Sequence, residues 1–173
     1  MTGVTLHIPT LETPRLTLRA HRLGDFDAYA QTLASDRARH MVEDPSRGQA
    51  WASFVNDVAS WSLHPFGVWA VDLKDGTHVG QVGINQPEYF PEPELGWILH
   101  DGHEGRGYAT EAARAACYWA TGKVRSLVSY ITPTNAGSIA VALRLGASHD
   151  TAASLPDGED ATETHVYRHW GPA

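Results

Sequence analysis

The sequence HEGRGYATEAA, residues 103–113, has the order expected of a glycine turn followed by the start of a helix. It comes directly after an apolar, strand-like run, and the residues that follow are rich in alanine. Gly105 and Gly107 permit backbone conformations that other residues resist, and they let a ligand approach the peptide groups closely. The first N–H groups of a helix have no intrahelical partner and lie at its positive end, so they attract an anion. A bare Gly-x-Gly alone favours an ordinary tight turn, and the flanking sequence here reverses that preference.

Three further motifs surround this turn in a fixed order. The chain opens with LETPRLTLR (11–19), has PELGWILH (93–100) before the turn, and continues with TPTNAGSI (132–139) and a terminal Leu-Gly-Ala at 145–147. Together the four motifs resemble the GNAT superfamily of acyl-CoA-dependent N-acetyltransferases, in particular the branch that contains the ribosomal-protein N-terminal acetyltransferases. The resemblance covers the chain from about residue 11 to its end.

The resemblance implies a single-domain α/β (α+β) fold over residues 1–173, with a core from about residue 11 to residue 170. It implies a mixed, mostly antiparallel sheet of six to seven strands, splayed in the middle and flanked by about four helices. The spacing of apolar residues and the turn signals agree with this arrangement. They predict helices over 24–35, 47–63, 107 onward and 135–145, and strands over 16–20, 66–71, 79–84, 95–99, 126–131 and 162–168.

The resemblance also implies an acetyl-CoA site. The backbone of Trp97, Ile98 and Leu99 is expected to bond the amide-bearing pantetheine arm, as an added strand would. The pyrophosphate is expected to lie on the amides of the turn, with a charged contact from Arg106; these amides belong to Gly105, Arg106, Gly107, Tyr108, Ala109 and Thr110. Glu104 departs from the family pattern, which has Gln or Arg there. A carboxylate beside two phosphates is unfavourable, so Glu104 is expected to point away, or the loop to be slightly repositioned.

Acetyl transfer to an amine requires a base, because only a neutral amine attacks the thioester. Glu94 matches the glutamate that the family carries just before the splay and is the first candidate, since burial there would raise its pKa. The alternative for Glu94 is a carboxylate that orders a water molecule or pairs with a basic neighbour. His100 is the second candidate, because alternation along the strand places it on the same face as Glu94.

The departing thiolate also needs a partner. Many family members use a Tyr at the position of Ala142, which has no proton to donate. The N-x-x-S pattern of the same branch is matched by Asn135 and Ser138, and it implies that the Ser138 hydroxyl lies near the cofactor sulfur. Asn135 is expected to cap the helix, which is compatible with a cofactor contact.

Composition narrows the choice of partners. The formal net charge of −7 and the pI of about 5.7 disfavour nucleic-acid binding and favour a cationic substrate. The single Cys117 excludes an intrachain disulfide, residues 1–9 lack the pattern of a signal peptide, and no run reaches the ~20 apolar residues of a membrane helix. We therefore expect a cytoplasmic protein, a monomer or a homodimer, that does not bind membranes.

Two hypotheses from different classes follow. The first is an N-acetyltransferase that uses acetyl-CoA and a primary amine, such as a protein N-terminus, an amino acid, a polyamine or an aminoglycoside. The second is a non-catalytic acyl-CoA-binding or sensing protein, which Ala142 and Glu104 favour. The ten histidines lie outside any recognised metal-binding pattern, so no metal is expected. The acidic residues Asp157, Glu159 and Asp160 are expected either to steer a cationic amine to the site or simply to keep a loop solvated.

Overall fold

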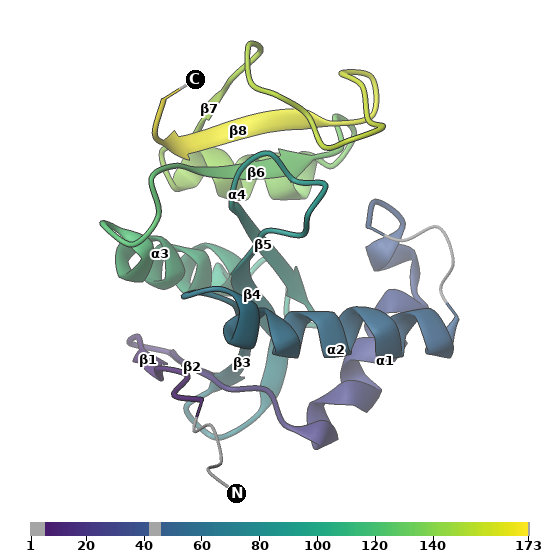
Figure 1. Cartoon of the computed structure of the whole chain (residues 1–173). Coiled ribbons are helices and arrows are strands. Elements are labelled where there is room, and N and C mark those ends of the chain that lie inside the picture. Colours follow the sequence, from purple (N-terminus) through teal and green to yellow (C-terminus); the bar gives the residue numbers. More distant parts are fainter. Residues whose placement is uncertain (1–5, 42–45, 173) are drawn as a thin grey trace, which may run out of the picture.

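One mixed sheet organises the computed structural model, which describes residues 6–41 and 46–172 (Figure 1). Its eight strands have the order β1-β2-β3-β4-β5-β6-β8-β7. Their bounds are Leu11–Glu12 (β1), Leu16–Arg19 (β2), Val68–Leu73 (β3), His78–Asn85 (β4), Glu94–Leu99 (β5), Leu127–Ile131 (β6), Ser148–His149 (β7) and His165–Trp170 (β8). The expected six to seven strands become eight because β1 and β7 have two residues each, too few to show a periodicity in the sequence. Residues 1–5, on which the expectation about a signal peptide partly depends, lie outside the described residues.

Four α-helices flank this sheet in the described part of the chain. They are α1 (Phe26–Leu33), α2 (Arg47–Leu63), α3 (Tyr108–Ala120) and α4 (Ala136–Arg144), and two short 3-10 turns occupy Leu23–Asp25 (η1) and Asp36–Ala38 (η2). The predicted bounds of α2 are confirmed. The helix expected over 24–35 instead begins as η1 and becomes α1 only at Phe26. None of the helices described is long and apolar enough to cross a membrane.

The sheet opens between β5 and β6, which form its one parallel pair among the described strands. Only Glu94 and Val128 are paired there, whereas β4 and β5 pair over six residues on the other side of β5. The predicted splay in the middle of the sheet is therefore confirmed, and β5 has one edge unpaired beyond its first residue. Peptide groups at such an edge need other partners, from side chains or from a ligand.

Side chains of β5 alternate between the two faces of the sheet. Leu95 packs into a core cluster with the small residues of α3, among them Ala113 and Ala116, which allow that helix to lie close to the strands. Ile98 packs into a different cluster, with Phe26 of α1 and Phe54 of α2. Helix α3 thus lies on one side of β5, and helices α1 and α2 lie on the other, as Figure 1 shows. Even-numbered residues of β5, including Glu94, belong to the α1–α2 face.

The helix starts near the opening are capped as the sequence predicts. Gly107 is the N-cap of α3, with a left-handed φ of 80°, and Gly105 has a φ of 70°. These are conformations that glycine adopts without strain. Asn135 is the N-cap of α4, and its side-chain oxygen accepts a hydrogen bond from the Ser138 N–H (3.1 Å).

Candidate active site

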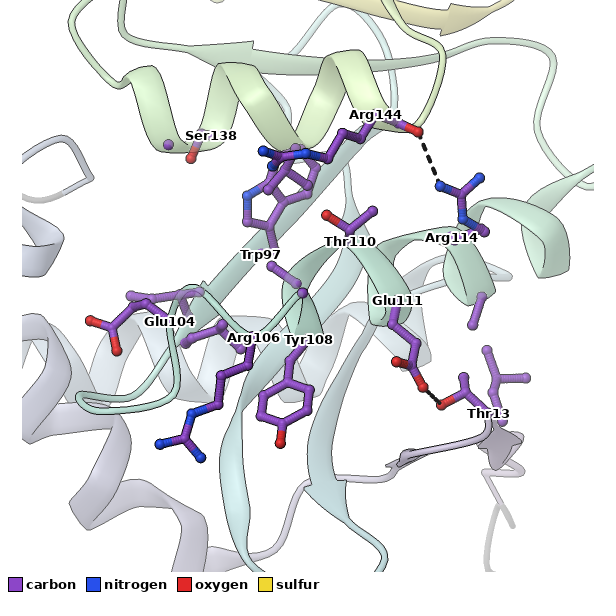
Figure 2. A pocket seen from close by; sticks show the side chains of 18 of the residues that line it. Thr13, Trp97, Glu104, Arg106, Tyr108, Thr110, Glu111, Arg114, Ser138 and Arg144 are labelled. Atoms are coloured by element: carbon purple, nitrogen blue, oxygen red, sulfur yellow. Dashed lines mark hydrogen bonds between the residues drawn. The ribbon is translucent and has the colours of Figure 1, made fainter.

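A groove of about 1830 Å³ runs along the opening of the sheet and over the start of α3 (Figure 2). Its walls come from β5, the loop before α3, the first turns of α3, the facing side of α4 and the turn between β1 and β2. All eleven predicted cofactor-binding residues line it: Trp97, Ile98, Leu99, Gly105, Arg106, Gly107, Tyr108, Ala109, Thr110, Asn135 and Ser138. The structure therefore brings these sequence-distant segments together around one open space.

The start of α3 presents backbone donors to this groove. The Glu111 N–H donates to the Gly107 carbonyl (3.0 Å), and this hydrogen bond is the first of the helix. The N–H groups of Tyr108, Ala109 and Thr110 precede that bond, and they point outward at the positive helix end. The Arg106 and Tyr108 side chains extend away from α4 (Figure 2), so they leave the space between the start of α3 and α4 open. Such a surface suits an anion.

Contacts from the β1–β2 turn brace this loop. Arg15 Nη1 donates to the Arg106 carbonyl (2.8 Å), and the guanidinium lies 4.8 Å from the centre of the Tyr108 ring. Arg15 Nε also bonds Glu111 Oε2 (2.6 Å), while Thr13 Oγ1 donates to Glu111 Oε1 (2.6 Å). These contacts fix the loop relative to the sheet. Sequence reasoning missed them, although the opening motif contains both Thr13 and Arg15.

Three exposed arginines give the groove its positive charge. Arg106, Arg114 and Arg144 all line it, and Arg114 Nη2 donates to the Arg144 carbonyl (3.0 Å), which joins α3 to α4 (Figure 2). Arginine presents a planar set of donors that matches phosphate oxygens. The chain as a whole is acidic, so this local excess of positive charge marks the groove as an anion site.

Along the edge of β5 that faces β6, some peptide groups have hydrogen-bond partners and others face the groove. Val128 N–H donates to the Pro93 carbonyl (3.1 Å), and Ser129 Oγ donates to the Leu95 carbonyl (2.6 Å). Along an extended strand, alternate residues direct their backbone groups to the same side. Trp97 therefore directs its N–H and C=O into the opening, whereas Ile98, opposite Gln81, directs its own toward β4. Of the three residues expected to bond the pantetheine arm, Trp97 and Leu99 face the groove with their backbone.

Glu94 lies where β5 and β6 separate. Its Oε1 accepts a hydrogen bond from the Tyr130 N–H (3.4 Å), a donor of β6 that the separated strand no longer pairs. Burial raises the pKa of Glu94 to about 7, and this outweighs the opposing effect of the Tyr130 bond. The nearby carboxylates of Glu159 and Asp57 raise the pKa further. A pKa near 7 suits a group that takes up and releases a proton at neutral pH, and Glu94 lies at the paired end of the strand opening, outside the residues that line the groove.

Asp57 of α2 is a second, half-buried carboxylate on this face, and sequence reasoning missed it. Gln81 Nε2 donates to its Oδ2 (2.8 Å), as does the Tyr29 hydroxyl (3.4 Å). Burial raises the pKa of Asp57 to about 6, despite these two bonds. Asp57 falls in the three- and four-residue repeat of the apolar residues of α2, so its position in the sequence does not distinguish it from them. Asp57 and Glu94 thus place two carboxylates on the α1–α2 face of the sheet.

His100 lies at the other end of β5 from Glu94. Six residues of extended chain separate the two, roughly 20 Å at ~3.3 Å per residue. Its Nδ1 shares a hydrogen bond with Thr32 Oγ1 (2.7 Å), and its ring contacts that of His78. Burial and the neighbouring His78 and His103 lower the pKa of His100 to about 4. The shared face was correctly predicted, but a buried, weakly basic imidazole at this distance fits a packing role in the sheet.

The buried neutral form of His100 leads to a prediction about stability. Its pKa of about 4 lies below the ordinary value of 6.5, so the unfolded chain binds this proton first, and the fold loses stability as pH falls from about 6.5 to about 4. Relative to the wild type, His100→Gln should therefore gain roughly 1–3 kcal/mol of unfolding free energy over that interval. Urea denaturation at several pH values measures the difference in unfolding free energy between the variant and the wild type. Glu94 and Asp57, whose raised pKa values act in the opposite direction, are present in both proteins, so their contributions cancel in this difference. The exposed His7→Gln should show no such gain, and a pH-independent difference for His100→Gln would refute the assignment.

The α4 side of the groove carries Ser138, whose hydroxyl faces the opening (Figure 2). Ala142, at the position where many relatives of the resembled family carry Tyr, is fully buried in the core. Burial raises the pKa of Cys117 to about 11, so its thiol is unsuited to act as a nucleophile. Within residues 6–41 and 46–172, no group of three or more His, Cys, Asp or Glu side chains is arranged to hold a metal ion.

A mixed sheet that opens beside a helix start rich in free amides is the architecture of the acyl-CoA-dependent acyltransferases. Comparison with known proteins agrees, because residues 15–148 match the acetyltransferase (GNAT) domain family. The chain belongs to this family and is an acyltransferase. The Rim-type resemblance of the opening and central motifs falls within it.

Solved structures support the assignment. An acetyltransferase from Agrobacterium tumefaciens is 44% identical, and the alignment covers 97% of this chain and 98% of that one with a TM-score of 0.86. A candidate ribosomal-protein-serine acetyltransferase from Vibrio cholerae shares the fold at 23% identity, with coverage of 95% and 98% and a TM-score of 0.72. A ribosomal-protein α-N-acetyltransferase in complex with coenzyme A shares it at 17% identity, with coverage of 92% and 96% and a TM-score of 0.68.

Proposed function

We propose that the protein transfers an acetyl group from acetyl-CoA to a primary amine, by direct attack of the amine within a ternary complex. The observation that carries this proposal is the placement of a basic, amide-rich helix start and a proton-exchanging carboxylate on the two ends of one open strand, β5. A structural relative with the same fold is known in complex with coenzyme A, which supports the choice of cosubstrate.

The groove matches the three parts of this cosubstrate. The amides of Tyr108 to Thr110 receive the pyrophosphate, and Arg114 and Arg144 add charge for the phosphates. The backbone of Trp97 and the N–H of Leu99 receive the pantetheine arm along the unpaired edge of β5, while the Leu99 carbonyl accepts a hydrogen bond from Arg37 Nε. An arm that follows β5 from Leu99 toward Glu94 directs its thioester to the point where the strands separate.

Two side chains then have distinct tasks. Glu94, with a pKa near 7, accepts a proton from the acceptor ammonium, directly or through water, and so generates the neutral amine. Ser138 donates a hydrogen bond to the thiolate as the carbon–sulfur bond breaks. With Ala142 at the position of the usual Tyr, the thiolate leaves stabilised by this bond, and its proton comes from solvent.

The acceptor is a cation before it reacts. Asp57 and Glu159 both raise the pKa of Glu94 through their negative charge, so acidic groups lie near the proposed base. Such a surface concentrates an ammonium group and disfavours an anionic substrate. A protein N-terminus and a small-molecule amine both have this charge. The fold shared with ribosomal-protein acetyltransferases favours the protein N-terminus.

The non-catalytic alternative rests on Ala142 and Glu104. It predicts that acetyl-CoA binds and that no amine is ever acetylated. A panel of peptide N-termini, amino acids, polyamines and aminoglycosides, each assayed for thiol release from acetyl-CoA, tests the proposal. Thiol release above the hydrolysis background with at least one amine supports transfer, and background release with every amine contradicts it.

A further inference from the structure

Arg37 of η2 links two parts of the groove that are distant in sequence. Its Nε donates to the carbonyl of Leu99, the last residue of β5 (3.0 Å), and its guanidinium forms an ion pair with the carboxylate of Glu104. Both side chains line the groove and are partly exposed, at 24% for Arg37 and 42% for Glu104. The Glu104 carboxylate points away from α3 (Figure 2), in agreement with the expectation from its sequence position.

This ion pair answers an electrostatic difficulty of the loop. Glu104 lies on the loop that leads to the amides of Tyr108 to Thr110, four residues before Tyr108, so it places a negative charge on the loop that receives a pyrophosphate. A free carboxylate on this loop would repel the phosphates, since charges near a protein surface interact more strongly than in bulk water. The bond from Arg37 to Leu99 holds the guanidinium in place, and the paired carboxylate is neutralised where it stands.

We propose that Arg37 is a positioning residue for cofactor binding, and that it acts by masking the charge of Glu104 and holding that side chain away from the phosphates. This inference rests on the proposed acetyl-CoA site. Arg37 then matters only while Glu104 is charged. If Arg37 instead bound a phosphate directly, its loss would weaken binding whether or not Glu104 were present.

A double-mutant cycle separates these two roles. Calorimetric Kd values for coenzyme A are measured for the wild type, Arg37→Ala, Glu104→Gln and the double variant, at low and high salt. Arg37→Ala should raise Kd by about tenfold or more, and salt should reduce this effect. Glu104→Gln should bind at least as tightly as the wild type, and the double variant should return to within about threefold of it. Kinetically, Arg37→Ala should raise KM for acetyl-CoA and leave kcat unchanged.

Arg39→Ala is the matched control, because Arg39 is exposed on the same segment and its side chain donates to the nearby Asp36 carbonyl. It removes the same charge and should leave Kd within about twofold of the wild type. A double variant as weak as Arg37→Ala would overturn the masking role, and so would an equal loss in Arg39→Ala. If the wild type itself does not bind coenzyme A, the proposed function fails together with this inference. Tight wild-type binding without coupling between Arg37 and Glu104 would overturn the inference alone.

Discussion

Replacing Gly107 with valine should weaken acetyl-CoA binding by at least about a hundredfold. Gly107 has a φ of 80°, a conformation that a β-branched residue adopts only at a cost of roughly 1–3 kcal/mol, so the turn will shift. The new side chain would also contact Arg15 Nη2, 3.4 Å from its Cβ, and the shifted turn would displace the amides that receive the pyrophosphate. Isothermal calorimetry with acetyl-CoA measures the loss.

Gly76→Val supplies the matched control. Gly76 has a similar φ of 89° in the hairpin between β3 and β4, and no other atom lies within 4 Å of its Cβ position. This variant suffers the same backbone strain away from the groove, so it should lose stability and keep its affinity. Unchanged affinity in a folded Gly107→Val protein would show that the loop does not hold the cofactor.

Replacing Glu94 with glutamine should lower kcat about a hundredfold near neutral pH, within the usual range for loss of a general base. A base acts in its deprotonated form, so wild-type kcat should rise with pH through about 7 and then level off. The variant should lose this inflection and recover part of its rate at high pH, where more of the amine is already neutral. Initial rates with saturating acetyl-CoA and amine across pH measure both effects.

Two further variants make the result specific to Glu94. Ser138→Ala should slow turnover equally at every pH, because it removes a partner of the thiolate and not a base. Glu88→Gln, at an exposed position in the loop before β5, should leave the profile unchanged. An unaltered inflection in Glu94→Gln, or a loss confined to KM for acetyl-CoA, would assign Glu94 to binding or to its bond with Tyr130.

The elements that could be predicted from the sequence are those whose signals lie in adjacent residues. Helix α2 has its predicted bounds because Ser46 accepts a hydrogen bond from the Gln49 N–H at its start and apolar residues recur along it. Gly107 and Asn135 were predictable as helix starts because turn and cap chemistry depend on adjacent residues. The splay between β5 and β6, however, came from the family resemblance, since no local pattern distinguishes a paired strand edge from an unpaired one.

The remaining parts of the site depend on contacts between distant segments. Arg15 and Glu111 are 96 residues apart, and Asp57 and Gln81 are 24 apart, so neither pair has a signature in the sequence. For His100, strand alternation predicts the correct face of the sheet, but it does not predict how far the side chain lies from Glu94. The partner of Glu104 was equally invisible, because the sequence predicted only that its side chain points away or that the loop is repositioned.

Incubation with acetyl-CoA that carries an isotopically labelled acetyl group, followed by mass spectrometry of both protein and amine, tests the central claim most directly. The amine is the best substrate of the panel. Direct transfer predicts that the label appears on this amine in an amount equal to the thiol released, and that the protein stays unlabelled. Label retained on the protein would contradict direct attack, and an unlabelled amine in the presence of tightly bound acetyl-CoA would identify the protein as a non-catalytic binder.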